Sequence, residues 1–180
     1  MKLSTDRSVL VLIDVQSRLF PAVNGKDQLL TNLVKAIKGF QLLGLPLIVT
    51  EQYRKGLGPT LPELSGIIKT FNLIEKRAFS CCGNESFLDE LKRINRKQVI
   101  VCGIEAHVCV YQTCRDLFDL GYEVFLLTDA VSSRNSDDKQ LAIRVLESMG
   151  VQLRSVEMAL FELINTSLHP KFKELTSIIK

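Results

Sequence analysis

A cysteine that follows an apolar segment is the most reactive group that the sequence offers. The apolar run Val99–Cys102 leads into Gly103, and a short turn then places Cys109 at the start of an expected helix. Backbone N–H groups in the first turn of a helix lack intrahelical partners and form the positive end of the helix dipole, and both features favour a thiolate. Cys109 is therefore a candidate nucleophile. Most intracellular cysteines are small buried hydrophobic residues, so the assignment depends on which side chains lie beside it.

Two charged residues follow other apolar segments in the same way. Asp14 comes directly after the apolar run Val9–Ile13, and Lys76 follows the short segment Leu73–Glu75. A carboxylate that abuts a buried strand is partly desolvated and must find polar partners. Considered alone, Asp14 would cap the next turn and Lys76 would be a solvated surface charge. Together with a cysteine, they form a set that is able to move a proton and attack a carbonyl group.

The segments that carry these residues predict buried strands, because continuous apolar runs are typical of strands covered on both faces. The expected strands are Val9–Ile13, Leu47–Thr50, Leu73–Glu75 as the weakest, Val99–Cys102, Val124–Leu127 and Val151–Leu153. Helical patterns separate most of them, including one from about Asn84 to Ile94. Three helical patterns end in a glycine directly before a strand, at Gly44, Gly121 and Gly150, as expected for helix-to-strand joints.

The alternation of strands and helices predicts an α/β fold: a three-layer, doubly wound sheet of six mainly parallel strands with helices on both faces. In such a sheet, the loops at the carboxyl ends of the strands build the site, especially where the strand order reverses. Asp14, Lys76 and Cys109 all follow strands at this edge. We therefore expect the Lys76 ammonium to lie within hydrogen-bonding reach of the Asp14 carboxylate, with Cys109 beside them.

Length and composition exclude several classes of protein. The 180 residues are 46% hydrophobic and contain no linker, so residues 1–180 are expected to form a single domain. The net charge of +3 comes from mixed acidic and basic residues without a basic stripe, so no nucleic-acid partner is expected. No apolar run is long enough for a signal-peptide core or a membrane span. A cytoplasmic protein is expected, with import into an organelle left open.

The cysteines and histidines indicate neither a disulfide framework nor a metal site. Five cysteines are an odd number, and Cys102 lies in an expected buried strand. Cys81 and Cys82 are adjacent rather than in a CxxC pair, and the two histidines are far apart. The turn after the first strand lacks the glycines of a nucleotide-binding loop. We therefore expect no metal and no cofactor.

The C-terminal third has more apolar residues than one helical face of a monomer needs. Beyond Met158 the sequence predicts helical segments around His169 and Pro170. The surplus apolar residues include Met158, Leu160, Phe161 and Leu163. They predict a homo-oligomer, a dimer or larger.

Three motifs around the candidate residues resemble those of the isochorismatase-like cysteine hydrolase superfamily, which includes nicotinamidases and N-carbamoylsarcosine amidohydrolases. They are DVQ at Asp14–Gln16, EKRAFS at Glu75–Ser80 and GIEAHVCV at Gly103–Val110. The resemblance covers nearly the whole chain and implies the isochorismatase-like, Rossmann-like sheet, a small-molecule substrate and a triad of Asp14, Lys76 and Cys109. It also implies a cis peptide between Ile104 and Glu105, and an oxyanion hole made by the backbone N–H groups of Glu105 and Cys109.

The resemblance has one departure that bears on the substrate. Nicotinamidases carry a metal-binding Asp-x-His after the second strand, whereas this chain reads TEQYRKGLGPTLPEL over residues 50–64. The segment resembles instead the isochorismatase domain-containing proteins, closest to their type 2-like members. The candidate substrate-binding residues are Gln16, Phe20, Tyr53 and His107, with Arg18 and Leu57 nearby. For each a structural role is equally open: His107 could bond within its own turn, and Tyr53 could pack under the loop.

The sequence leaves three functions open. The first is a metal-independent hydrolase in which Cys109 opens a small amide or a related acyl bond. The second is hydrolysis of a vinyl ether such as isochorismate, with acid–base catalysis by Asp14 and no covalent thiol adduct. The third is a non-catalytic binding or scaffold protein.

The two charged residues predict opposite effects on the pKa of the Cys109 thiol. The positive charge of Lys76 predicts a pKa below the free-cysteine value of about 8.5. The charge of Asp14 opposes this and predicts a neutral thiol coupled to the carboxylate.

Overall fold

The computed structural model describes residues 1–70 and 72–180, and it contains the expected parallel sheet. The six strands lie in the order β3-β2-β1-β4-β5-β6, and each neighbouring pair is parallel. The strands are β1 (Ser8–Ile13), β2 (Leu47–Gln52), β3 (Asn72–Lys76), β4 (Gln98–Ile104), β5 (Glu123–Ser132) and β6 (Gln152–Arg154). The predicted fold class is confirmed. The strand that the sequence indicated most weakly, β3, is an edge strand whose residues alternate between exposed and buried.

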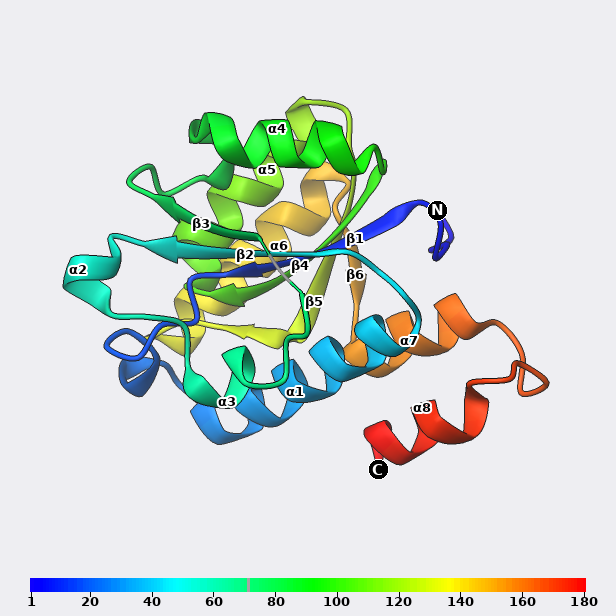
Figure 1. Cartoon of the computed structure of the whole chain (residues 1–180). Coiled ribbons are helices and arrows are strands. Elements are labelled where there is room, and N and C mark those ends of the chain that lie inside the picture. Colours follow the sequence, from blue (N-terminus) through cyan, green and yellow to red (C-terminus); the bar gives the residue numbers. More distant parts are fainter. Residues whose placement is uncertain (71) are drawn as a thin grey trace.

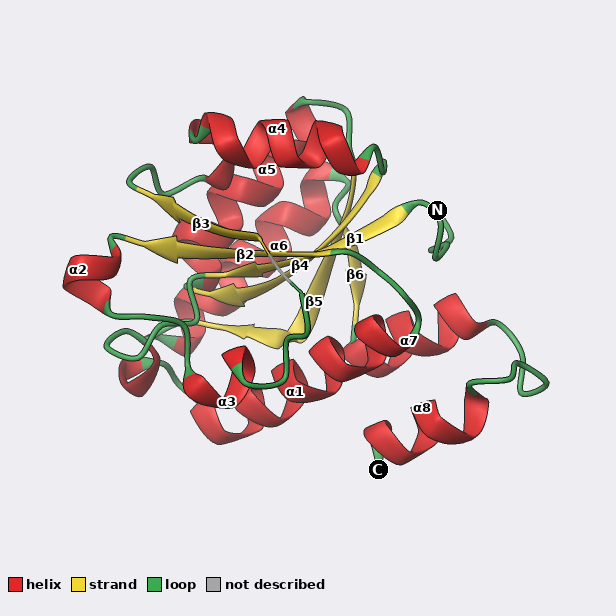
Figure 2. Ribbon diagram, viewed as in Figure 1, coloured by secondary structure: helices red, strands yellow, loops and turns green. Residues whose placement is uncertain are grey.

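Helices cover both faces of the sheet (Figure 1, Figure 2). The described residues form α1 (Lys26–Leu42), α2 (Arg54–Leu57), α3 (Pro62–Ser65), α4 (Glu85–Ile94), α5 (Tyr111–Asp119), α6 (Ser136–Met149), α7 (Val156–Ile164) and α8 (Phe172–Ile179). Shorter helical turns are η1 (Phe20–Ala22), η2 (Cys81–Gly83) and η3 (Ala106–Val110). Helices α1, α7 and α8 lie on one face, and α4, α5 and α6 lie on the other. None of the helices in the described ranges is long and apolar enough to cross a membrane.

Apolar residues occupy successive positions along the strands because each face of the sheet has its own hydrophobic core. In β1, Leu10 and Leu12 pack in the cluster that includes the buried residues of α1 and α7. Val9 and Val11 alternate with them and pack in the cluster that includes α4, α5 and α6. Successive strand side chains point to opposite faces, so a strand that is covered on both sides needs apolar residues at every position.

The strand order reverses between the central strands β1 and β4, and their carboxyl ends meet there. Gly103, near the end of β4, has φ +122°, and a Cβ atom at this position would lie 2.1 Å from the carbonyl oxygen of Ile13. Only glycine allows this close approach of the two backbones. The close approach brings the loop after β1 and the loop after β4 together, which is the place where an open α/β sheet builds its site.

The C-terminal helices use only part of their apolar residues for the core. Leu160 and Leu163 of α7 are buried against the sheet, whereas Met158 is 55% and Phe161 38% exposed. Phe161 packs edge-to-face on Phe172 of α8, with ring centroids 6.4 Å apart. Of the apolar residues that predicted an oligomer, only Met158 and Phe161 on the outer side of α7 are exposed. The exposed apolar surface is therefore smaller than the sequence indicated.

Candidate active site

The structure brings Asp14 and Lys76 together at the carboxyl edge of the sheet. Asp14 follows β1 directly, with a left-handed backbone at φ +53°, and Lys76 is the last residue of β3. The Lys76 Nζ atom lies 2.7 Å from Asp14 Oδ2, and both side chains are 0% exposed. A buried ion pair is tolerated only when further hydrogen bonds satisfy its remaining polar atoms.

Further hydrogen bonds complete this pair. Thr50 Oγ1 donates to Asp14 Oδ1 at 2.7 Å. Lys76 Nζ donates to Gln52 Oε1 at 2.8 Å and to the carbonyl oxygen of Phe79 at 2.9 Å. Burial alone lowers the pKa of Lys76, but the negative charge of Asp14 and its hydrogen bond outweigh this effect, and the pKa is raised. Lys76 is therefore a fixed cation rather than a proton donor.

Cys109 lies beside the pair, in the turn η3 that leads into α5. Its side chain is almost completely buried, with the residue 5% exposed. Burial raises the pKa of the Cys109 thiol, and the charge of Asp14 raises it further, whereas Lys76 lowers it. The prediction of a thiol that titrates below the ordinary value is therefore wrong. Burial and Asp14 outweigh Lys76, and the resting thiol is neutral.

The backbone before Cys109 has an unusual geometry. The peptide bond between Ile104 and Glu105 is cis, as the resemblance implied. The Glu105 carboxylate is buried and accepts hydrogen bonds from Arg134 N and Nε, both at 3.0 Å. The side chain of Glu105 is thus committed to the loop after β5.

Of the candidate substrate-binding residues, Gln16 and Phe20 are buried. Gln16 Nε2 donates to the carbonyl oxygens of Gly58 at 2.6 Å and Gln52 at 3.1 Å, so Gln16 ties the loop after β1 to the loop after β2. Phe20, in η1, packs in the core on the α1 side of the sheet. Both residues hold loops of the site in place.

Tyr53 and His107 are more accessible than these two residues. Tyr53 is 38% exposed and lies under the guanidinium of Arg77, which is 4.0 Å from the ring centroid. His107 Nδ1 lies 2.9 Å from Ser133 Oγ, so the ring bonds to the loop after β5 rather than within its own turn. The expectation of a bond within the turn is wrong, because the two loops pack against each other.

Three residues of this site were not predicted from the sequence. Thr50 and Gln52 contact Asp14 and Lys76, respectively. Cys81 is completely buried, its Sγ lies 3.8 Å from Thr50 Oγ1, and burial raises its pKa to about 11. The signal for Thr50 and Gln52 was their place at the end of the second apolar run, at the same edge as Asp14. Nothing in the sequence distinguished Cys81 from its neighbour.

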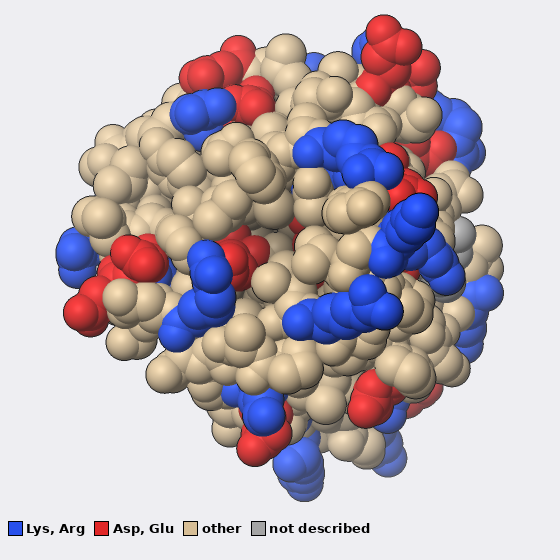
Figure 3. Space-filling model, turned by 90° about the vertical axis from the view of Figure 1, so that its left-hand side faces the viewer, with Lys and Arg blue, Asp and Glu red and all other residues tan. Residues whose placement is uncertain are grey.

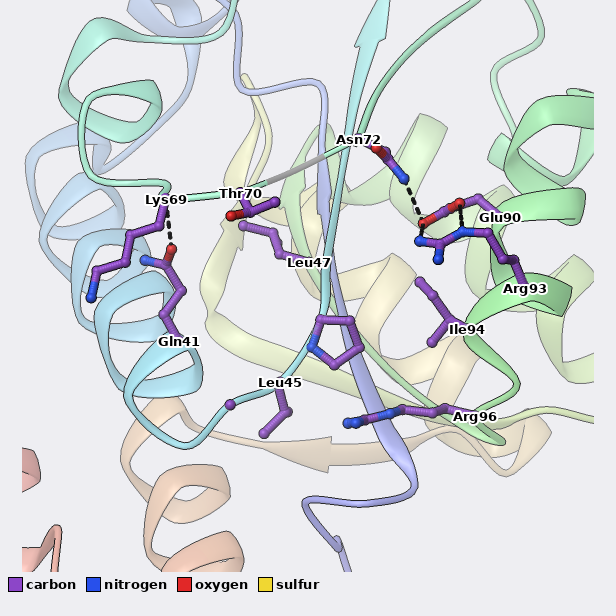
Figure 4. Close-up of a pocket in the computed structure, with 12 residues that line it drawn as sticks. Gln41, Leu45, Leu47, Lys69, Thr70, Asn72, Glu90, Arg93, Ile94 and Arg96 are labelled. Atoms are coloured by element: carbon purple, nitrogen blue, oxygen red, sulfur yellow. Dashed lines mark hydrogen bonds and ion pairs between the residues drawn. The ribbon is translucent and has the colours of Figure 1, made fainter.

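Asp14, Lys76 and Cys109 line none of the cavities found among the described residues. One cavity of about 580 Å³ opens at the amino ends of β2 and β3, between the carboxyl ends of α1 and α4. It lies at the edge of the sheet opposite the site (Figure 4).

Figure 3 looks onto the carboxyl edge and shows basic side chains around a mostly uncharged centre. Exposed arginines of the loops at this edge are Arg18, Arg77 and Arg134. In the described ranges, no group of three or more His, Cys, Asp and Glu residues is placed to hold a metal ion.

The parallel sheet thus gathers an aspartate, a lysine and a cysteine where its strand order reverses. The family model described as the isochorismatase domain matches residues 8–158, and the chain belongs to this family. Isochorismatase domain-containing protein 2 of Danio rerio is 38% identical over 99% of this chain and 89% of its own length. The predicted family is confirmed.

Solved structures agree with this assignment. The MAR1 ribonuclease of Caenorhabditis elegans has a TM-score of 0.94 at 36% identity, over 99% of this chain and 92% of that chain. YcaC of Escherichia coli, described as an octameric hydrolase of unknown specificity, has a TM-score of 0.90 at 24% identity, over 98% of this chain and 95% of that chain. The YcaC likeness shows the fold alone.

Proposed function

We propose that the protein is a metal-independent hydrolase that cleaves an amide or a related acyl bond of a small molecule, with Cys109 as the nucleophile. The observation that carries the proposal is the fully buried Asp14–Lys76 pair, with Nζ and Oδ2 2.7 Å apart, beside a nearly buried thiol. A buried ion pair is costly for stability, and its position where the strand order reverses favours a functional origin.

In the first half of the reaction, Asp14 accepts the thiol proton while Sγ of Cys109 attacks the carbonyl carbon. The carbonyl oxygen becomes an oxyanion, for which the backbone N–H groups of Glu105 and Cys109 would each supply about 3 kcal/mol of stabilisation. The tetrahedral adduct collapses when the C–N bond breaks and the leaving nitrogen takes the proton from Asp14. The product of this half is a thioester on Cys109.

In the second half, Asp14 removes a proton from water, and the resulting hydroxide attacks the thioester carbon. The C–S bond breaks, the carboxylic acid leaves, and Cys109 recovers its proton from Asp14. Lys76 remains charged throughout and compensates the negative charge that alternates between Asp14 and the oxyanion. The neutral resting thiol fits this sequence, because proton transfer accompanies the attack.

Cleavage of RNA is a second candidate. A relative with 36% identity is named a ribonuclease, and Arg18, Arg77 and Arg134 are exposed at the carboxyl edge, where phosphate groups would meet them. The burial of Asp14, Lys76 and Cys109 favours a small substrate instead, because a phosphodiester within a polymer is too bulky to reach them. Vinyl ether hydrolysis, in which Asp14 transfers the proton and Cys109 forms no bond, uses the same site.

A substrate screen distinguishes these candidates and the non-catalytic alternative. The wild-type protein is incubated with small amides, ureides, enol ethers and a single-stranded RNA, with Cys109→Ala and Asp14→Asn as parallel samples. The proposal predicts turnover of an amide or ureide that both variants lose. Turnover of the enol ether or the RNA alone would replace the proposal, and no turnover of any compound would favour a binding protein.

We further propose a cytoplasmic homo-oligomer, a dimer or larger. The exposed apolar side chains Met158 and Phe161 on the outer side of α7 support self-association, and the related fold of YcaC is described as an octamer.

A further inference from the structure

The Lys76 ammonium has more acceptors around it than it has protons. Its three N–H bonds are shared among Asp14 Oδ2 at 2.7 Å, Gln52 Oε1 at 2.8 Å, and the carbonyl oxygens of Phe79 at 2.9 Å and Ala78 at 3.3 Å. Only two of these acceptors belong to side chains, and only Asp14 is charged. Among the described residues, Gln52 is thus the one neutral side chain that accepts a hydrogen bond from the ammonium group.

Other hydrogen bonds fix the orientation of the Gln52 amide. Its Nε2 donates to the carbonyl oxygen of Arg77 at 2.7 Å, so its Oε1 must face Lys76. A reversed amide would point N–H groups at the ammonium. The backbone N–H of Gln52 donates to Gln16 Oε1 at 2.7 Å, and Gln16 in turn holds the carbonyl oxygen of Gly58. The acceptor is therefore preorganised by two neighbouring loops.

The sheet register explains why these two side chains meet. Gln52 and Lys76 are paired residues on the neighbouring parallel strands β2 and β3, and each is the last residue of its strand. Paired residues of neighbouring strands extend their side chains from the same face of the sheet. The Gln52 amide therefore reaches the ammonium without leaving the edge of the sheet where Asp14 lies.

We propose that Gln52 is a positioning residue that acts through Lys76, a role that rests on the proposed hydrolase function. Gln52 holds the ammonium against Asp14 Oδ2, and Thr50 holds Oδ1. With both oxygens held, the carboxylate keeps one orientation toward Cys109. Without Gln52, the ammonium turns toward the backbone carbonyls, and the carboxylate and the thiol lose their fixed partner.

A double-mutant cycle tests this role by measuring alkylation of Cys109, which needs no known substrate. Iodoacetamide labelling of the Cys109 peptide is followed by mass spectrometry in the wild type, Gln52→Leu, Lys76→Met and the double variant. Gln52→Leu should slow labelling at neutral pH about tenfold, the loss expected for a hydrogen bond to a charged group. In the Lys76→Met background it should cause no further loss, because a residue that acts through another is coupled to it.

Gln41 is the matched control, because it makes the same kind of bonds far from the site. Its Nε2 donates to the carbonyl oxygen of Ile67 at 2.9 Å, and its Oε1 accepts from Lys69 N at 2.8 Å. Gln41→Leu should leave Cys109 labelling unchanged. Equal slowing by Gln52→Leu with and without Lys76, or slowing by Gln41→Leu of the same size, would overturn the proposal and assign Gln52 a general structural role.

A second variant keeps the test decisive if Gln52→Leu does not fold. Gln52→Glu keeps the size and the acceptor but adds a negative charge beside the ion pair, so the pH profile of Cys109 labelling should move upward by about one unit. Gln41→Glu should leave the pH profile of Cys109 labelling unchanged. An unchanged profile in Gln52→Glu would overturn the proposal.

A substrate from the screen allows a further test by turnover. Gln52→Leu should lower kcat and leave KM unchanged. Turnover that survives Cys109→Ala would instead overturn the hydrolase proposal alone.

Discussion

The three charged or nucleophilic residues of the site were predictable because each follows an apolar run that ends at the same edge of the sheet. Asp14, Lys76 and Cys109 meet there although they come from different strands. The residues that orient them were not predicted, because Thr50 and Gln52 resemble ordinary strand-end polar residues. Of the two opposing predictions for the thiol, the lowered pKa expected from Lys76 was wrong and the neutral thiol expected from Asp14 agrees with the structure, because burial adds to the effect of Asp14.

The two charges beside Cys109 act on its pKa in opposite directions, and this gives a prediction with a definite sign. Lys76 lowers the pKa of the thiol and Asp14 raises it. Lys76→Ala should therefore shift alkylation of Cys109 to higher pH, and Asp14→Asn should shift it to lower pH. Peptide mapping across a pH series measures both shifts, with the buried Cys114 as the internal control.

Equal labelling of Cys109 and Cys114, unaffected by either substitution, would contradict this electrostatic coupling. Cys109 would then be a packing residue like Cys114. A shift of both variants in the same direction would show that the substitutions disturb the packing rather than the charge.

The hydrogen bond from Thr50 to Asp14 is expected to contribute to stability. Thr50→Val keeps the shape of the side chain but leaves a buried carboxylate oxygen without its donor, so the free energy of unfolding should fall by about 1–3 kcal/mol. Thr31→Val is the control, because Thr31 donates to a backbone oxygen on the exposed face of α1. Urea unfolding that gives the same small loss for both variants would show that the Thr50 bond adds nothing.

At the scale of elements, the close approach of β1 and β4 is what brings the site together. Gly103→Ala should lower the free energy of unfolding by more than about 3 kcal/mol, because its Cβ would lie 2.1 Å from the backbone of Ile13 at φ +122°. Gly121→Ala is the control, since Gly121 also has a positive φ, +79°, but nothing lies within 4 Å of its Cβ position. The control should lose only about 1 kcal/mol.

The result can be measured by urea unfolding of both variants. Equal losses at Gly103 and Gly121 would show that the two strands move apart at little cost. The joint between β1 and β4 would then be a flexible part of the site.

Most elements were predictable from the sequence because their patterns are local. Successive side chains of a strand enter the cores on opposite faces of the sheet, so the buried strands appear as continuous apolar runs in the sequence. Helix α4 begins within a residue of its predicted start. The short helices α2 and α3 were not predicted, because a four-residue helix has too few residues to show a period. They lie in the segment over residues 50–64, where the sequence departs from nicotinamidases.

At the scale of the whole molecule, self-association is the property that the single chain leaves to experiment. The exposed Met158 and Phe161 predict a dimer or larger at micromolar concentration, which light scattering measures. Met158→Lys should weaken the assembly by placing a charge on the outer side of α7, and Lys139→Glu on α6 serves as a charge-changing control. A monomer for the wild type, or no effect of Met158→Lys, would contradict an interface at this surface.

If Cys109 is the nucleophile, it becomes acylated during turnover. The most direct measurement is intact-protein and peptide mass spectrometry after rapid acid quench of a reaction with an amide or ureide from the screen. We predict an added acyl mass on the peptide that contains Cys109, absent from Cys109→Ala and lost together with turnover in Asp14→Asn. Turnover that persists in Cys109→Ser, disappears in Asp14→Asn and leaves no adduct would contradict the account and favour vinyl ether hydrolysis centred on Asp14.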